Sequence, residues 1–87
     1  MSTFCIKKNP TSSMNPWLCH TAPQRGLGDQ LIYAGLEDIF RSGHRLVTFQ
    51  SPEAARDFIA QNPMCCDDQN VIYEIVASIN EVFMRPV

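Results

Sequence analysis

Residues 51–63, with the sequence SPEAARDFIAQNP, carry the clearest secondary-structure signal in this chain. Ser51 is a good N-cap, Pro52 suits the first helical position, and the carboxylate of Glu53 complements the positive end of the helix dipole. Four apolar side chains then share one helical face: Ala54, Ala55, Phe58 and Ile59. The pattern predicts a helix over 52–61 that packs on a core and ends before an Asn-Pro pair.

The segments on both sides of this helix have strand character. Residues 45–49 (RLVTF) and 71–77 (VIYEIVA) are rich in β-branched and apolar side chains, and we expect the first to be a central strand. The apolar residues of the second also recur at helical spacing, so a helix over 68–84 is an open alternative. As a strand, the second segment would turn at 78–81 and return over 82–85 as a hairpin.

The N-terminal part contains two further strand patterns separated by a loop. Residues 4–8 (FCIKK) alternate apolar and polar side chains, and an Asn-Pro pair ends the pattern. Residues 17–20 (WLCH) form a shorter candidate strand between two proline-containing loops. We therefore expect two short strands ahead of the first helix.

A second helix is predicted over 29–42, where apolar residues recur near a 3.6-residue period. Asp29 can cap its N-terminus and Gly43 can end it in the left-handed conformation. Gly35 weakens this helix by roughly 1 kcal/mol relative to Ala. The alternative is a strand over 31–33 followed by a shorter helix.

The length of 87 residues fits one domain, and a hydrophobic fraction of 45% is enough for one thin core. The predicted fold class is therefore a small single α+β domain, residues 1–87. Its mixed or antiparallel sheet of three to five strands is packed by two helices, at about 29–42 and 52–61.

Charge and hydropathy exclude several classes of partner. Seven basic and nine acidic residues give a net charge of −2, which disfavours general nucleic-acid binding. No run of about 18 apolar residues that could span a membrane occurs, and the N-terminus lacks the pattern of a secretory signal. We expect a cytoplasmic protein, or one of the host cytoplasm if a phage encodes it, with its cysteines reduced.

The cysteines could serve in a zinc site, as a nucleophile, or simply as packing groups. Adjacent pairs such as Cys65-Cys66 and Cys19-His20 lack the Cys-x(2–4)-Cys spacing of zinc knuckles, and their side chains tend to diverge. A Cys19 nucleophile would need His20 or His44 as its base, and neighbours along a strand rarely face each other. The prediction is no metal, no cofactor and no catalytic residue, with the four cysteines serving as packing groups.

The loop 25–28 (RGLG) precedes the predicted helix start, an arrangement that can hold a phosphate on free N–H groups. Asp29 would compete for those donors and repel an anion, so a loop and helix cap are favoured.

Five residues are candidate contacts for a protein partner, namely Trp17, His20, Arg25, Phe83 and Arg85.

One resemblance to known proteins is carried by 49–59 (FQSPEAARDFI) followed by 73–76 (YEIV). This order of helix and strand resembles a pattern in short phage and prophage accessory proteins, some of them anti-CRISPR proteins, and covers about a third of the chain. The resemblance implies a stoichiometric inhibitor that occupies a surface of a host nucleoprotein or defence complex, and no active residue carries over.

The sequence thus predicts a non-catalytic protein-binding module, in its most specific form a phage-encoded inhibitor. The first alternative is a small regulatory or structural homodimer that pairs through its apolar C-terminal strand. A zinc-binding domain or a small enzyme is the third alternative.

Overall fold

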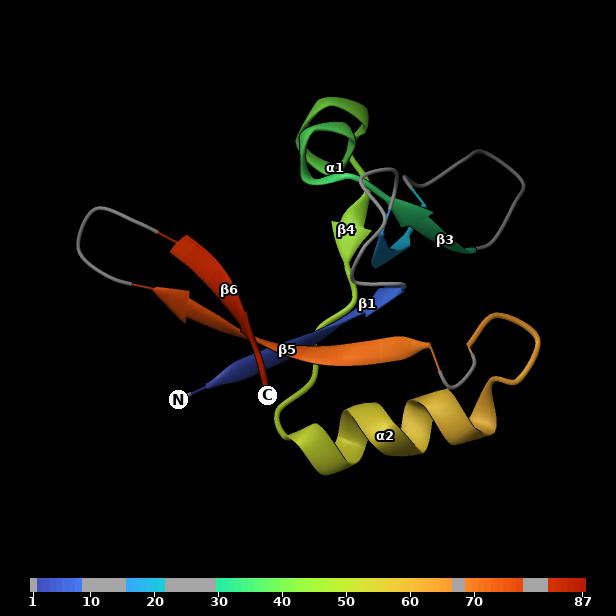
Figure 1. The fold of residues 1–87 in the computed structure, drawn as a ribbon. Helices are drawn as coiled ribbons and strands as arrows, with labels where there is room; N and C mark the ends of the chain where they lie inside the picture. Colours follow the sequence, from blue (N-terminus) through green and yellow to red (C-terminus); the bar gives the residue numbers. More distant parts are fainter. Residues whose placement is uncertain (1, 9–15, 22–29, 67–68, 78–81) are drawn as a thin grey trace.

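Within the residues that it describes, the computed structural model contains two helices and one antiparallel sheet of six strands, more than the three to five strands predicted (Figure 1). It describes residues 2–8, 16–21, 30–66, 69–77 and 82–87, and of residues 40, 77, 82 and 83 it describes the backbone alone. In chain order the elements are β1 (Thr3–Lys8), β2 (Trp17–His20), β3 (Leu31–Ala34), α1 (Leu36–Ser42), β4 (Arg45–Leu46), α2 (Pro52–Gln61), β5 (Asn70–Ala77) and β6 (Val82–Pro86).

The strands are ordered β3-β2-β1-β5-β6, and β4 pairs with β2 outside this path. β1 is the middle strand and pairs with β5 along its whole length, from Thr3 opposite Ile75 to Lys8 opposite Asn70. Cys5 and Ile6 of β1 are both fully buried although their side chains point to opposite faces of the sheet. The sheet is therefore covered on both faces, which explains why the cysteine in the FCIKK pattern is as buried as the isoleucine.

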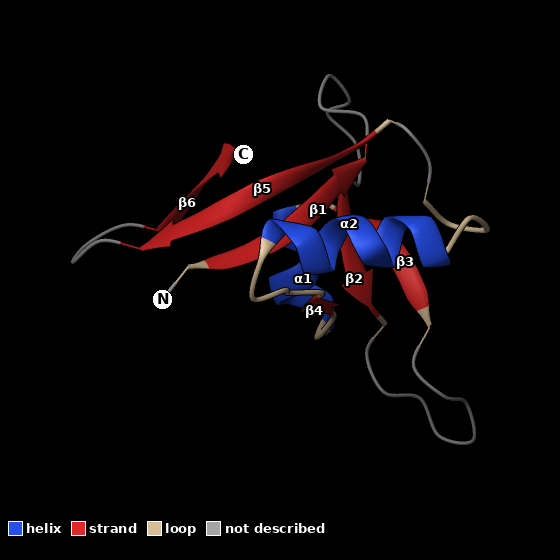
Figure 2. Ribbon diagram, turned by 90° about the horizontal axis from the view of Figure 1, so that it is seen from below, coloured by secondary structure: helices blue, strands red, loops and turns tan. Residues whose placement is uncertain are grey.

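The two helices lie on opposite sides of this sheet, α1 at the top and α2 at the bottom of Figure 1. Figure 2 shows α2 lying across the strands, with the β5–β6 hairpin extending beyond it. Two apolar clusters result. The cluster on the α2 side has buried residues Ile6, Leu18, Val47, Ala55 and Cys66. The cluster on the α1 side has buried residues Cys5, Trp17, Cys19, Ala34 and Ile39.

The helix predicted over 52–61 is confirmed together with its cap. Ser51 Oγ accepts a hydrogen bond from the backbone N–H of Ala54 at 3.1 Å, and Pro52 occupies the first turn. Ala55 is buried, and Phe58 and Ile59 pack on the same cluster, whereas Ala54 is exposed. The apolar stripe therefore faces the sheet as predicted, except at its first residue.

The helix predicted over 29–42 is wrong in its first half, and the alternative is confirmed. Leu31–Ala34 form β3, which pairs with β2 from His20 opposite Leu31 to Trp17 opposite Ala34. Gly35 is the N-cap of the shorter α1, and Gly43 ends that helix with a left-handed φ of 73°. Pairing with β2 overrides the helical spacing here, because a sheet neighbour satisfies the backbone at the edge of the core.

The segment predicted as a central strand over 45–49 is only partly a strand. Its two-residue β4 pairs with the end of β2, and Phe49 makes a separate bridge to Phe4 with N–O distances of 2.9 and 2.8 Å. The segment follows β2 and then β1, so its pairing is interrupted, and the central position belongs to β1. Residues 71–77 lie in β5 and pair with β6 as the predicted hairpin. The helix alternative over 68–84 is thereby excluded.

Candidate functional site

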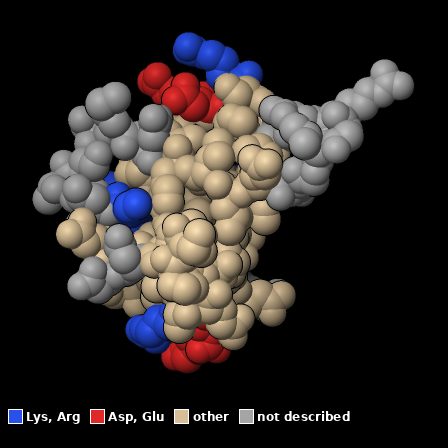
Figure 3. All heavy atoms as spheres, turned by 90° about the vertical axis from the view of Figure 1, so that its right-hand side faces the viewer, with Lys and Arg blue, Asp and Glu red and all other residues tan. Residues whose placement is uncertain are grey.

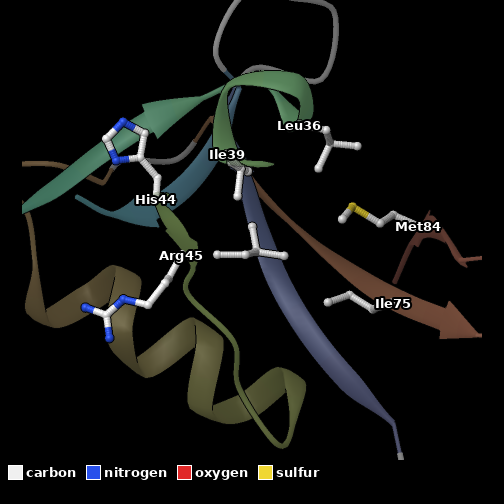
Figure 4. Close-up of a pocket in the computed structure, with 7 residues that line it drawn as sticks. Leu36, Ile39, His44, Arg45, Ile75 and Met84 are labelled. Carbon is white, nitrogen blue, oxygen red and sulfur yellow. The ribbon is translucent and has the colours of Figure 1, made fainter. Parts of the chain in front are cut away.

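An open apolar hollow of about 430 Å³ lies between α1, β4 and the β5–β6 hairpin. The hollow is lined by Leu36, Ile39, His44, Arg45, Leu46, Ile75 and Met84. In Figure 4 the labelled apolar side chains gather around one space, whereas the His44 ring and the Arg45 guanidinium group point away from it. The surface that the hollow offers to a ligand is therefore almost entirely hydrocarbon and thioether.

Local sequence features place each wall of this hollow. α1 has only seven residues, and its N-cap glycine contributes no side-chain hydrogen bond. Gly43 then reverses the chain so that β4 runs back beside β2. On the other wall, the register of the hairpin sets Ile75 of β5 directly opposite Met84 of β6. Leu36 at the start of α1 remains 40% exposed because no element of the described chain covers it.

Two buried thiols belong to the same cluster as the hollow. The Sγ of Cys5 lies 4.0 Å from the Sδ of Met84, and the Sγ of Cys19 donates to the carbonyl of Trp17 at 3.2 Å. Burial raises the pKa of Cys5 to about 12, with a further contribution from Cys19, and burial raises the pKa of Cys19 to about 11. Both groups therefore remain protonated at neutral pH, a state in which a thiol is a poor nucleophile.

Trp17, the first candidate partner contact, is only 7% exposed. Its ring meets that of Tyr73 edge to face, with centroids 5.2 Å apart and an interplanar angle of 80°. The ammonium of Lys7 lies 5.3 Å from the Trp17 centroid and 5.5 Å from the Tyr73 centroid. The tryptophan thus packs within the core of the α1 side, beneath a cationic side chain.

The other candidate contacts that the structure describes lie on two strands, His20 on β2 and both Phe83 and Arg85 on β6. His20, half-buried at the end of β2, lies opposite Leu31 and Arg45. Phe83 lies opposite Val76 on β6, an edge strand that β1 and β5 separate from β2. Arg25 lies outside the described residues.

Arg85 is engaged within the protein. Its Nη2 and Nε atoms lie 2.6 and 2.8 Å from Oε1 of Glu74, on the neighbouring strand. Hydrogen bonds from Arg85 and from Ser2 lower the pKa of the Glu74 carboxyl group. A partner that binds Arg85 would have to compete with this exposed ion pair.

Metal-ligating residues form no cluster of three or more His, Cys, Asp or Glu side chains within the part of the chain that the structure describes. The expectation that the side chains of Cys65 and Cys66 diverge is wrong. Their Sγ atoms lie 3.6 Å apart in the turn that follows α2.

Figure 3 shows one side of the molecule, on which acidic and basic side chains gather at the top and the bottom and much of the surface between is uncharged. Among the residues that are described, no helix has both the length and the apolar character that crossing a membrane takes.

Comparison with known proteins gives no further assignment, because no family model, no curated protein and no solved structure matches this chain.

The residues of the hollow were missed as a site because the sequence assigns them to the core. Leu36 and Ile39 belong to the periodic pattern of 29–42, and Ile75 belongs to the β-rich run of 71–77. Only the shortness of the helix after Gly35 could have suggested that part of this apolar surface would stay uncovered.

Proposed function

We propose that the protein is a non-catalytic binding module that holds an apolar side chain of a partner protein in the hollow between α1 and the β5–β6 hairpin. The observation that carries the proposal is an open apolar surface on a chain that otherwise buries its apolar clusters. The raised pKa values of Cys5 and Cys19 support the non-catalytic reading, because they keep the nearest thiols protonated.

The chemistry of the lining favours a protein segment over a small ligand. At about 430 Å³ the hollow is large enough for either. Small-molecule sites contain a few polar groups that fix the orientation of the ligand, whereas the core of a protein interface is depleted of charge and has a polar rim. The polar ends of His44 and Arg45 point away from the apolar space, which is the second arrangement (Figure 4).

The position of Met84 indicates how such a segment would be held. Met84 lines the hollow and belongs to β6, which is an edge strand in the order of the sheet. An extended segment that adds to a sheet edge gains main-chain hydrogen bonds and directs alternate side chains to one face. A partner strand beside β6 would thereby place an apolar side chain over the space between Leu36 and Met84.

A selection from a library of displayed random peptides tests this proposal. We expect the enriched peptides to share one or two large apolar side chains in an extended sequence, and to bind the purified protein in a fluorescence polarisation titration. Leu36→Asn should weaken this binding about tenfold, the range for losing one well-packed apolar contact. The exposure of Leu36 means that the variant should still fold.

Asp38→Asn is the matched control, since it introduces the same side chain at an exposed position of α1 that does not line the hollow. Its affinity for the selected peptides should equal that of the parent. Equal losses in both variants would contradict the assignment of the hollow as the binding site. Failure to enrich any peptide with an apolar anchor would contradict the proposed function.

A homodimer is the second candidate function, and the edge position of β6 favours it because a second copy can pair with the same strand. Light scattering over a range of concentrations separates the two, since a monomer at every concentration excludes the dimer. The resemblance of 49–59 and 73–76 to anti-CRISPR proteins gives the first candidate its most specific form, in which the partner belongs to a host defence complex.

A further inference from the structure

The turn after α2 brings two adjacent thiols into contact, at the opposite side of the sheet from the hollow. The Sγ atoms of Cys65 and Cys66 are 3.6 Å apart. Cys65 is half-buried, Cys66 is buried in the α2-side cluster, and the preceding Met64 is 99% exposed. The pair thus lies at the edge of the α2-side cluster, with Cys65 as the less buried residue and its Sγ donating to the carbonyl of Asn62 at 3.7 Å.

Hydrogen bonds fix the peptide that joins these two cysteines at both of its ends. The carbonyl of Asn62 accepts from the backbone N–H groups of Cys65 and Cys66, with N–O distances of 3.2 and 2.9 Å. The Tyr33 hydroxyl donates to the carbonyl of Cys65 at 2.6 Å, and the side-chain amide of Asn70 donates to the Tyr33 oxygen at 2.8 Å. Residues of β3 and β5 thus hold the turn in one shape.

The Tyr33 hydroxyl is also placed beside the thiols themselves, since its oxygen lies 3.7 Å from the Sγ of Cys66. The hydroxyl has one hydrogen, so it can donate either to the Cys65 carbonyl or to this sulfur, and the shorter contact favours the carbonyl. The phenol therefore holds the turn in shape and lies against the inner sulfur.

The spacing of the two sulfurs fits a bridging ion better than a disulfide. Adjacent Cα atoms across a trans peptide are about 3.8 Å apart, which is shorter than the roughly 4.4–6.8 Å found across disulfides. Two thiolates on a tetrahedral ion with metal–sulfur bonds of about 2.3 Å lie about 3.8 Å from each other. The observed 3.6 Å separation is close to that value.

We propose that Cys65 and Cys66 form a two-thiolate site for a soft, thiol-seeking metal or metalloid ion. Two sulfurs are too few for a closed structural zinc site, which takes four ligands, and no third ligating side chain joins them among the residues described. Thiolate donors select soft ions, so the ion expected here is one that binds sulfur in preference to oxygen or nitrogen. On binding, each thiol releases one proton and no electron is transferred.

Phenylarsine oxide is the probe for this site. Its arsenic forms one bond to each sulfur, its oxygen leaves as water with the two thiol protons, and the oxidation state of arsenic does not change. Native mass spectrometry of the folded protein should show one equivalent bound, with a mass gain equal to the reagent less one water. Proteolysis should place the adduct on the peptide that contains Cys65 and Cys66.

Removing one sulfur should reveal whether both are used. Cys65→Ser and Cys65→Ala should each weaken arsenical binding about 100-fold or more, because the second bond of a chelate forms intramolecularly. Tyr33→Phe should weaken it about tenfold through loss of the group that holds the turn. Circular dichroism checks that each variant is folded.

Met64→Ser is the matched control, since it changes an exposed neighbour in the same turn to serine and leaves both thiols in place. It should bind the arsenical like the parent. Mapping of the adduct to Cys5 or Cys19, unchanged affinity after loss of the Cys65 thiol, or failure of the folded parent to bind would each overturn the proposal. The result is independent of the peptide-binding test, because none of these residues lines the hollow.

Discussion

The two faces of the sheet are built from the same strands but are covered to different extents. On the α2 side, a ten-residue helix with a side-chain N-cap packs its apolar stripe over the strands. On the α1 side, a seven-residue helix without a side-chain cap contributes the buried Ile39 and leaves Leu36 partly exposed. The first face is covered by a helix of ten residues, whereas the second contains the hollow.

In this protein, the length of the covering helix sets how much of each sheet face is available for binding. An α-helix rises 1.5 Å per residue, so α2 spans about 15 Å and α1 about 10 Å. The shorter span cannot reach over both β4 and the β5–β6 hairpin. The uncovered strip between them consists of residues whose patterns are those of an ordinary core.

The largest change in the free energy of unfolding is expected for truncation of a buried strand isoleucine, and it should differ between the two faces of the sheet. Ile6→Ala should lower the free energy of unfolding by about 2–5 kcal/mol, since Ile6 is fully buried in the cluster on the α2 side. Ile75→Ala should cost less than half as much, because Ile75 is half-buried and borders the hollow. Urea unfolding of both variants measures the two costs, and equal costs would mean that the two faces are packed equally well.

The next largest change in the free energy of unfolding is expected from the thiols of the α1 side at high pH. Their pKa values are raised from 9.0 to about 12 for Cys5 and to about 11 for Cys19. Above pH 9 the unfolded chain loses these protons while the folded chain keeps them, so stability should fall as pH rises. Between pH 9 and 10, each thiol should lower the free energy of unfolding by about 1 kcal/mol.

Urea unfolding at several pH values checks this expectation, and Cys19→Ala should reduce the slope while Met64→Ser, which removes no thiol, should leave it nearly unchanged. The window stops at pH 10 because Tyr33, whose pKa is also raised by burial, adds a loss of the same sign above its ordinary value of 10.0. A flat profile between pH 9 and 10 would show that the buried thiols titrate as they do in the unfolded chain.

The smallest effects concern the caps of the two helices. Ser51→Ala should cost about 1 kcal/mol, because it removes the oxygen that accepts from the N–H of Ala54. Gly35→Ser should gain a few tenths of a kcal/mol, since Gly35 has an extended N-cap conformation and forms no side-chain cap bond. Thermal unfolding followed by circular dichroism measures both, and a loss of stability in Gly35→Ser would show that this position tolerates no side chain.

Two of the candidate partner contacts also make pairings within the protein. Trp17, a large amphipathic side chain, packs against Tyr73 under Lys7. Arg85, a charge in the last strand, pairs with Glu74. Neither pairing has a signal in the sequence, because both partners come from distant segments that the sheet brings together.

Elements whose signals are local could be predicted from the sequence. The cap and apolar stripe of α2, the β-branched run of β5 and the left-handed Gly43 each depend on residues within one or two turns of chain. These features were confirmed because short-range hydrogen bonds and backbone preferences act without knowledge of the rest of the fold.

Three other features depend on contacts between distant segments. Leu31–Ala34 form a strand instead of a helix, β1 instead of 45–49 lies at the centre of the sheet, and the hollow stays open. Contacts with Asn62 and Tyr33 also turn the sulfurs of Cys65 and Cys66 toward each other. Each of these outcomes depends on which strands pair and how far a helix reaches, and such long-range contacts override local preference when they satisfy buried backbone and side-chain groups.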